Sequence, residues 1–198
     1  MFENENIIYK DICGVEFIQF KKLLQYDDIV THAYCLGIDK NFRTSRADGV
    51  KITDEEYNKA LSNYKDLCKV LDLNYINIVK TIQTHTDNIS NIEEKKIEGP
   101  DFNTHKDVDA LCTNKEDIIL STTNADCILL LFFDPVKKVI ANVHSGWKGT
   151  FQRISVKTVR NMKEKYGCDE KNIIVCMCPS IRKCHFEVGK EVYNLFYK

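Results

Sequence analysis

Residues 118–150 read IILSTTNADCILLLFFDPVKKVIANVHSGWKGT, and this stretch decides the fold class. Three β-rich runs lie within it, namely Ile118–Thr122, Ile128–Phe133 and Val139–Val143. Asp134-Pro135 places a turn between the last two runs, because proline fixes a turn geometry. Adjacent strands joined by short turns, in a chain that also contains helices, predict an α+β sandwich rather than a doubly wound sheet.

The chain before this stretch contains short strands and one well-signalled helix. We expect strands over Ile7–Tyr9, Val15–Phe20 and Tyr75–Thr84. Thr53 and Glu56 form a capping box that predicts the start of the helix. Residues at helical spacing follow the cap and are expected to pack in the core: Tyr57, Ala60, Leu61, Tyr64, Leu67, Cys68 and Leu71.

The remaining segments complete the expected architecture. Glu93–Lys106 is charged and is expected to form a loop. Gly149-Thr150 opens a second helix that ends at Gly167, and Ile173–Cys178 forms a last strand before Pro179. The residues expected on one face of the second helix are Phe151, Ile154, Thr158, Val159 and Met162.

Composition narrows the class of protein. The chain has 198 residues, 43% of them hydrophobic and 29% charged, which is typical of a single globular domain. Lys and Arg number 28 against 29 Asp and Glu, and this balance argues against binding nucleic acid through bulk charge. No apolar run approaches the roughly 18 residues of a membrane span, and the acidic start lacks the pattern of a signal peptide. We therefore expect a cytoplasmic protein whose nine cysteines stay reduced.

Three residues that carry chemistry follow or end predicted strands. His85 follows the strand from Tyr75, Cys127 lies between two strands, and His144 ends the run from Val139. Two imidazoles and a thiolate form a suitable ligand set for Zn²⁺, with a fourth position open. The same residues also fit a cysteine nucleophile with a histidine base, and the spacing alone does not separate the two interpretations from ordinary structural residues.

A second group of soft ligands lies near the C-terminus. Cys176, Cys178, Cys184 and His185 fall within ten residues, which would suit a structural zinc site. Their spacing differs from that of the common zinc knuckles, and alternation along a strand points Cys176 and Cys178 the same way. Buried thiols are the favoured interpretation of this group.

Several motifs in this chain resemble those of a widespread family first described as multicopper polyphenol oxidases, or laccase-domain proteins. Members of that family are also described as purine nucleoside phosphorylases with adenosine deaminase activity. The matching elements occur in family order: Gln83-Thr84-His85, Asp109–Asn114, Asn124–Cys127 with Asp134-Pro135, His144–Gly149, and Pro179–Ile181 with Cys184–Gly189.

The resemblance implies a fold and a site. The family fold is a four-layer α/β/β/α sandwich with mixed β-sheets, which would occupy residues 1–198 as one domain. In the family the corresponding histidines and cysteine bind a catalytic zinc ion, which here implies His85, Cys127 and His144. Beside them, Asp126 is expected either to orient a ligand or handle a proton, or to cap its turn. Each histidine is also expected to pass its second ring nitrogen to a carboxylate or carbonyl, and Asp126 and Asp87 are the nearest candidates in the sequence.

Three further side chains near these motifs have two interpretations each. Trp147 either packs under the site or stacks on a purine. Lys148 and Arg153 either meet phosphate or are plain surface charges.

The chain also departs from the family pattern. A Thr-Arg pair that usually lies near the position of Tyr34–Gly37 lacks its arginine here, and Arg43 or Arg46 is the available substitute. His185 replaces the second cysteine of a Cys-Cys pair. Relatives continue beyond the Glu187-Val188-Gly189 element, so we expect that the C-terminal part of the family domain is missing.

The resulting hypothesis is a zinc-dependent purine nucleoside phosphorylase that acts on adenosine, inosine and methylthioadenosine with phosphate, and that deaminates adenosine. The alternatives are a metal-free cysteine hydrolase, such as an amidase that edits cell-wall precursors, a copper phenol oxidase, and an inactive metal-binding relative. We expect no nucleic-acid or membrane partner, and no sequence feature identifies a protein partner.

Overall fold

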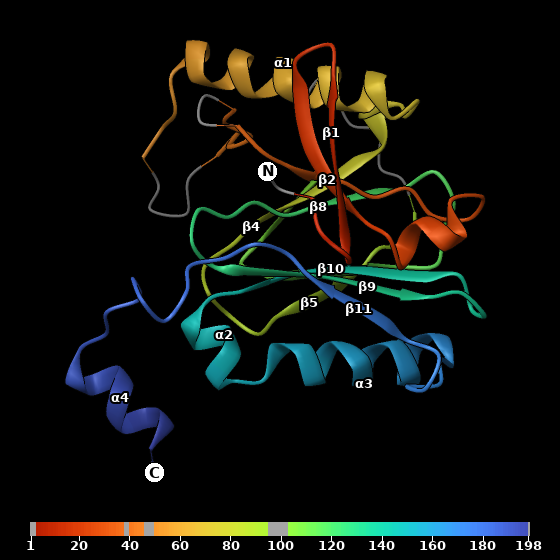
Figure 1. The fold of residues 1–198 in the computed structure, drawn as a ribbon. Coiled ribbons are helices and arrows are strands. Elements are labelled where there is room, and N and C mark those ends of the chain that lie inside the picture. The colour runs from red at the N-terminus through yellow and green to blue at the C-terminus, as the bar shows by residue number, and fades with distance from the viewer. Residues whose placement is uncertain (1–2, 38–39, 46–49, 95–102, 198) are drawn as a thin grey trace. The chain divides into compact units, whose positions relative to one another are not determined.

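The fold is described from a computed structural model, over residues 3–37, 40–45, 50–94 and 103–197 (Figure 1). The chain divides into two compact units. Unit 1 comprises Met1–Ile78, Lys95–Asn103 and Asp117–Ile119, and unit 2 comprises Val79–Glu94, Thr104–Glu116 and Leu120–Lys198. No helix within the described ranges is both long and apolar enough to cross a membrane.

Unit 1 begins with a three-stranded antiparallel sheet. Its strands are β1 (Ile7–Ile12), β2 (Val15–Phe20) and β3 (Tyr34–Cys35), in the order β1-β2-β3. Cys13 and Gly14 both have positive φ, 54° and 76°, as the tight turn between β1 and β2 requires. A 3₁₀ turn, η1 (Leu23–Tyr26), follows the second strand.

The helix expected after Thr53 is confirmed as α1 (Asp54–Val70). Thr53 Oγ1 accepts the backbone N–H of Glu56, and Glu56 Oε2 accepts that of Thr53 at 2.8 Å, so the capping box is complete. Tyr64 and Cys68 of this helix pack with Ile78 in a buried cluster.

The strand expected over Tyr75–Thr84 begins later than predicted. Tyr75–Asn77 forms a 3₁₀ turn, η2, because the Asn74 side chain accepts the N–H of Ile76 and caps it. The strand itself is β4 (Ile78–Ile82).

Unit 2 contains a five-stranded sheet of order β11-β9-β10-β7-β5. Its pairs are antiparallel except for the parallel pair of β5 and β7. Asp134 Oδ1 accepts the N–H groups of Val136 and Lys137, which fixes the turn expected between β9 and β10. The bounds are β5 (Ile89–Asn91), β7 (Ala110–Thr113), β9 (Ile128–Asp134), β10 (Val139–Ser145) and β11 (Ile174–Met177).

One face of this sheet packs against helix α3 (Ile154–Tyr166), which lies beside it in Figure 1. Val139, Val143, Ile154 and Met162 are completely buried in the shared core. Gly167 ends the helix in the left-handed conformation, as expected.

The second helix differs from the expectation at its start. It is divided into α2 (Trp147–Phe151) and α3, because Arg153 adopts a left-handed φ of 60° between them. The break changes the phase of the helical face, so Phe151, expected on the same face as the completely buried Ile154, is 43% exposed.

A second three-stranded sheet has the order β6-β4-β8, with β6 (Asn103–Lys106) and β8 (Ile119–Ser121) on either side of β4. The loop expected over Glu93–Lys106 is therefore wrong at its end, and residues 95–102 lie outside the described ranges. β3, β5 and β7 were not predicted from the sequence, and neither was α4 (Lys190–Phe196). β7 shows no alternation because all four of its residues are buried. The result is a mixed α and β fold with mixed sheets, as expected.

Candidate metal centre

Three side chains of unit 2 converge. One ligand atom from each of His85, Cys127 and His144 lies within 4.8 Å of the others. Cys127 Sγ is 3.8 Å from His85 Nε2, and the two imidazole rings meet edge to face with centroids 5.0 Å apart. Ligand atoms in a tetrahedral zinc site are separated by about 3.3 to 3.6 Å. The three side chains thus fit a bound metal ion in donor type, and the 3.8 Å between Cys127 Sγ and His85 Nε2 is close to the required separation.

His85 is held in an unusual backbone conformation. It follows β4 with φ at 63°, a left-handed value that residues other than glycine seldom adopt. The carboxylate of Asp109 accepts the backbone N–H groups of Thr84, His85 and Thr86 at 2.8 to 3.2 Å. These bonds offset the strain of the turn and direct an exposed imidazole toward the cysteine.

His144 lies near the end of β10 and is only 3% exposed. Its Nδ1 is 2.7 Å from Asp109 Oδ1, and its backbone N–H donates to the Asp109 carbonyl. Burial alone would lower the pKa of His144, but hydrogen bonds with Asp109 and Cys127 outweigh it and raise the pKa to about 9. Because Nδ1 is occupied by the carboxylate, Nε2 is the nitrogen available to a metal.

Asp109 is the residue that the sequence analysis did not assign. The carboxylate is completely buried and accepts hydrogen bonds from both histidine-bearing segments. Burial opposes its ionisation, yet the hydrogen bonds of His144 and Thr86 hold the pKa of Asp109 below its usual value. The signal was a carboxylate directly before the apolar run Ala110–Cys112, where burial demands partners.

The carboxylates expected to orient the histidines were Asp126 and Asp87, and for His144 that expectation is wrong. Asp87 forms an ion pair with Lys157, and Asp126 is exposed in its turn. Asp109 takes this role instead because the hydrogen bonds of Asn88 and His144 with its backbone bring it between the two histidines.

The segment that carries Cys127 is tied down by its own hydrogen bonds. The side chain of Gln83 donates to the Thr123 carbonyl at 2.6 Å and accepts the Thr123 N–H at 2.9 Å. Asn124 Nδ2 donates to the Cys127 carbonyl at 2.6 Å, which closes the turn. Cys127 is left half-buried with its sulfur toward His85.

A glycine leaves room for the group. A Cβ at Gly146 would lie 2.5 Å from His85 Cδ2 and 3.3 Å from Cys127 Sγ. Its φ of −67° is one that any residue adopts, so side-chain space and not backbone freedom requires glycine here.

Lys148 supplies positive charge near the three ligands. Burial lowers the pKa of His85, and the nearby His144 and Lys148 lower it further, while Asp109 opposes them. Lys148 Nζ lies 5.6 Å from the centre of the Trp147 ring, and Lys148 is exposed whereas Trp147 is half-buried. Arg153 is exposed in the break between α2 and α3.

The other candidate residues do not join this group. Cys176 and Cys178 are buried, whereas Cys184 and His185 are exposed, and across the described ranges only His85, Cys127 and His144 form a group of metal-ligating type. Arg46 lies outside the described residues, and Arg43 belongs to unit 1.

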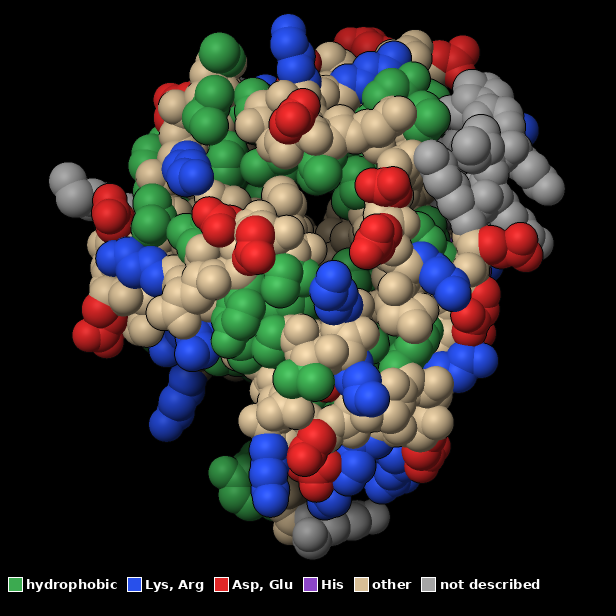
Figure 2. All heavy atoms as spheres, turned by 90° about the vertical axis from the view of Figure 1, so that its right-hand side faces the viewer, with side chains coloured by type: hydrophobic (Ala, Val, Ile, Leu, Met, Phe, Trp, Pro, Cys, Tyr) green, Lys and Arg blue, Asp and Glu red, His purple; other side chains and the backbone are tan. Residues whose placement is uncertain are grey.

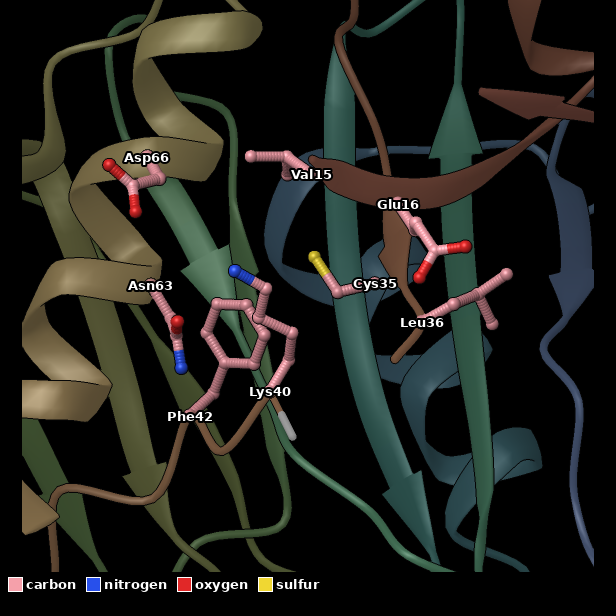
Figure 3. A pocket seen from close by; sticks show the side chains of 8 residues that line it. All are labelled: Val15, Glu16, Cys35, Leu36, Lys40, Phe42, Asn63 and Asp66. Atoms are coloured by element: carbon pink, nitrogen blue, oxygen red, sulfur yellow. The ribbon is translucent and has the colours of Figure 1, made fainter. Parts of the chain in front are cut away.

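Unit 1 contains a small pocket between α1 and the β2–β3 region (Figure 3). Its polar lining comes from Glu16, Lys40, Asn63 and Asp66, together with the Cys35 thiol. The pocket has room for about one water molecule, far less than a small-molecule site needs. The candidate site is therefore the group in unit 2.

Known proteins resemble this chain in sequence. A purine nucleoside phosphorylase of Clostridium acetobutylicum is 36% identical over 147 residues, which are 73% of this chain and 56% of that protein. An adenosine deaminase, RL5, of an unknown prokaryotic organism is 32% identical over 136 residues, which are 67% of this chain and 51% of that protein. The chain thus spans little more than half the length of these relatives.

Solved structures share its fold. The hypothetical protein YfiH of Bacillus licheniformis matches with a TM-score of 0.78 at 23% identity, over 96% of this chain and 71% of that chain. YlmD of Geobacillus stearothermophilus matches with a TM-score of 0.66 at 24% identity, over 71% of this chain and 53% of that chain. The fold is therefore of the YfiH and YlmD type.

The family assignment rests on a match that covers most of the sequence. Residues 37–198 match the family described as multi-copper polyphenol oxidoreductase laccase, and this range includes all three convergent side chains and Asp109. The chain belongs to this family.

Proposed function

We propose that this chain is a zinc-dependent purine nucleoside phosphorylase that acts on adenosine, inosine and methylthioadenosine and also deaminates adenosine. The observation that carries the proposal is the convergence of His85, Cys127 and His144 within 4.8 Å, with Asp109 behind His144. The names of the relatives from Clostridium acetobutylicum and of RL5 supply the two activities.

The ligand set favours a single zinc ion over the linked copper centres of a phenol oxidase. Zinc accepts two imidazoles and a thiolate with one position left open. The chain has five histidines, and the other three make different contacts. His32 is buried against Phe20, His105 contacts Ser90, and His185 is exposed.

When bound, zinc would lower the pKa of a coordinated water to about 7 or polarise a phosphate oxygen. The residues of the chain would do the rest. His85 is exposed and Cys127 half-buried, and Asp109 keeps a proton on His144 Nδ1, so that Nε2 is the nitrogen that gives up its proton to bind a metal. In phosphorolysis, phosphate oxygen attacks the ribose C1′ carbon, the bond to the purine nitrogen breaks, and the purine leaves with a proton.

Lys148 is the basic residue that we assign to phosphate. It lies close enough to lower the pKa of His85, and its exposed ammonium group can meet an anion that enters the site. Trp147 beside it offers an aromatic face to the purine. The near balance of 28 basic and 29 acidic residues in the chain favours a small anionic substrate over a polyanion. Figure 2 shows basic and acidic side chains interspersed on one face of the molecule.

The test measures two products from adenosine in the presence of phosphate, free adenine and inosine, with the zinc-loaded protein. We expect both to form, to be lost in Cys127→Ala, and to persist in the matched control Cys184→Ser, which changes an exposed cysteine outside the group. An unchanged rate of inosine formation by Cys127→Ala would refute the proposal.

A metal-free cysteine hydrolase is the second candidate, because Cys127 Sγ and His85 Nε2 lie 3.8 Å apart, as a nucleophile and its base would. A chelator separates the two candidates. It would abolish turnover by a zinc enzyme, whereas it would leave a cysteine hydrolase active or increase its activity.

A further inference from the structure

We infer that Gln83 is a positioning residue that sets the separation of His85 and Cys127, the exposed and the half-buried ligand of the site. The inference rests on the proposed metal binding. It assigns to one amide side chain the task of holding together the two segments that carry these ligands.

Gln83 forms two hydrogen bonds with the backbone of one residue, Thr123. Gln83 Nε2 donates to the Thr123 carbonyl at 2.6 Å, and Gln83 Oε1 accepts the Thr123 N–H at 2.9 Å. A side-chain amide has the same donor and acceptor pair as a peptide group. The two bonds therefore reproduce, with a side chain, the exchange of hydrogen bonds between paired residues of an antiparallel ladder.

This pairing lies just after the ends of two neighbouring strands. β4 ends at Ile82 and β8 ends at Ser121, and the two strands are neighbours in one sheet. Beyond β4 the chain turns through the left-handed conformation at His85. The Gln83 side chain therefore links the two chain segments just after their last strand residues.

A third hydrogen bond, from Thr81, holds the Gln83 amide. Thr81 Oγ1 donates to Gln83 Oε1 at 3.0 Å, so the oxygen accepts two hydrogen bonds. The Thr123 N–H and carbonyl decide which end of the amide faces each of them, since the first only donates and the second only accepts. A carboxylate at the same position would keep the acceptor and lose the donor.

The two paired residues lie close in sequence to two of the ligands. Gln83 lies two residues before His85, and Thr123 lies four residues before Cys127 in a turn closed by Asn124. Among the described residues, the Asp109 carboxylate bonds to Thr84, His85, Thr86 and His144, so it holds the His85 segment and not the Cys127 segment. Gln83 is the side chain that joins the two segments directly.

The experiment compares Gln83→Met, which removes both bonds at similar length, and Gln83→Glu, which removes only the donor. The matched control is Asn161→Leu. It removes another pair of amide hydrogen bonds in unit 2, those with Asn91 at 2.8 and 3.0 Å, and touches none of the ligands.

Two readouts are measured on each protein. Amide hydrogen exchange over residues 122–127 of the metal-free protein reports the restraint, and competition with a chromophoric chelator reports zinc affinity. In Gln83→Met we expect the Thr123 amide hydrogen to exchange about tenfold faster or more. We expect zinc to bind about 10- to 100-fold more weakly, the usual effect of losing a residue that orients a metal ligand. Gln83→Glu should fall between, and Asn161→Leu should match the native protein in both.

Zinc affinity in Gln83→Met that stays within about twofold of Asn161→Leu would overturn the positioning role. Unchanged exchange at Thr123 would overturn the restraint on which the role depends. A native protein that binds no zinc while exchange responds as expected would instead refute the proposed function, so the two failures are distinguishable.

Discussion

Two regions of this chain are rich in cysteine and histidine, and only one of them forms a site. His85, Cys127 and His144 come from three distant segments and lie within 4.8 Å of one another. Cys176, Cys178, Cys184 and His185 lie within ten residues of sequence, yet they divide between the core and the surface. Nearness in sequence is thus a poor guide to a metal centre.

The difference lies in what holds each side chain. Asp109 and Gln83 make hydrogen bonds that aim the first group inward. In the second group, strand alternation sends Cys176 and Cys178 into the core. Cys184 and His185 lie exposed at the surface, where His185 Nδ1 is 3.0 Å from Cys184 Sγ. A site requires supporting residues as well as ligands.

Zinc affinity should depend on a cysteine of the first group and not on a cysteine of the second. We expect Cys127→Ala to lower zinc affinity by about 1,000-fold or more, because one of three protein ligands is lost. Cys184→Ser should leave affinity unchanged. Zinc content after dialysis against a chelator series checks this, and equal losses in the two variants would show that zinc is held elsewhere.

Thiol reactivity should sharpen the contrast. Burial raises the pKa of Cys176 to about 11 and that of Cys178 to about 12, so about one Cys178 thiol in 10⁴ is ionised at pH 8. In metal-free protein we expect alkylation of Cys127 to be at least about 100-fold faster than that of Cys178. Zinc should protect Cys127 and leave Cys178 as it was.

Peptide mapping by mass spectrometry measures each site separately, with Cys13 and Cys184 as exposed references. Failure of zinc to slow the alkylation of Cys127 would contradict metal ligation by its sulfur.

The sequence carried the ligands but not their supports. The strand ends and family motifs identified His85, Cys127 and His144, because those residue types are chemically distinctive. Asp109 was not assigned, since its role depends on backbone groups of Thr84, His85 and Thr86 that periodicity does not place. Likewise, β7 was missed because full burial removes the alternation by which a strand is recognised. The break at Arg153 was also missed, since left-handed arginine has no sequence signal.

Crowding of the site gives a smaller effect. We expect Gly146→Ala to weaken zinc binding by about 10- to 100-fold, because the new methyl group would lie 2.5 Å from His85 Cδ2 and must displace the ring. The control is Gly14→Ala, where no atom lies within 4 Å but φ is 76°.

Both glycine variants should lose stability in thermal unfolding, Gly14→Ala through backbone strain of about 1 kcal/mol. Only Gly146→Ala should lose zinc affinity. A Gly146→Ala protein with native affinity would show that the His85 ring is not held where the site needs it.

The smallest expected effect separates two buried histidines. His144 lies against a carboxylate, whereas His32 in unit 1 is 8% exposed and its Nε2 accepts the backbone N–H of Phe20 at 2.7 Å. That bond requires a neutral ring. Burial, with a contribution from Lys10, lowers the pKa of His32 to about 4.

A folded pKa below the unfolded value of about 6.5 means that the unfolded chain takes up the proton first, so stability is complete above pH 6.5 and declines as the pH falls toward 4. Between pH 8 and 5.5 we expect His32 to cost about 1.4 kcal/mol, or tenfold in the folding equilibrium. His32→Gln keeps an acceptor for Phe20 but does not titrate, so its stability should decline less over this range by that amount. Urea unfolding at both pH values measures the free energy of unfolding of each protein. The contribution of the carboxylates is common to both proteins and drops out when the two declines are subtracted. Equal declines would mean that His32 is already protonated in the folded state, and that its ring does not accept the Phe20 N–H.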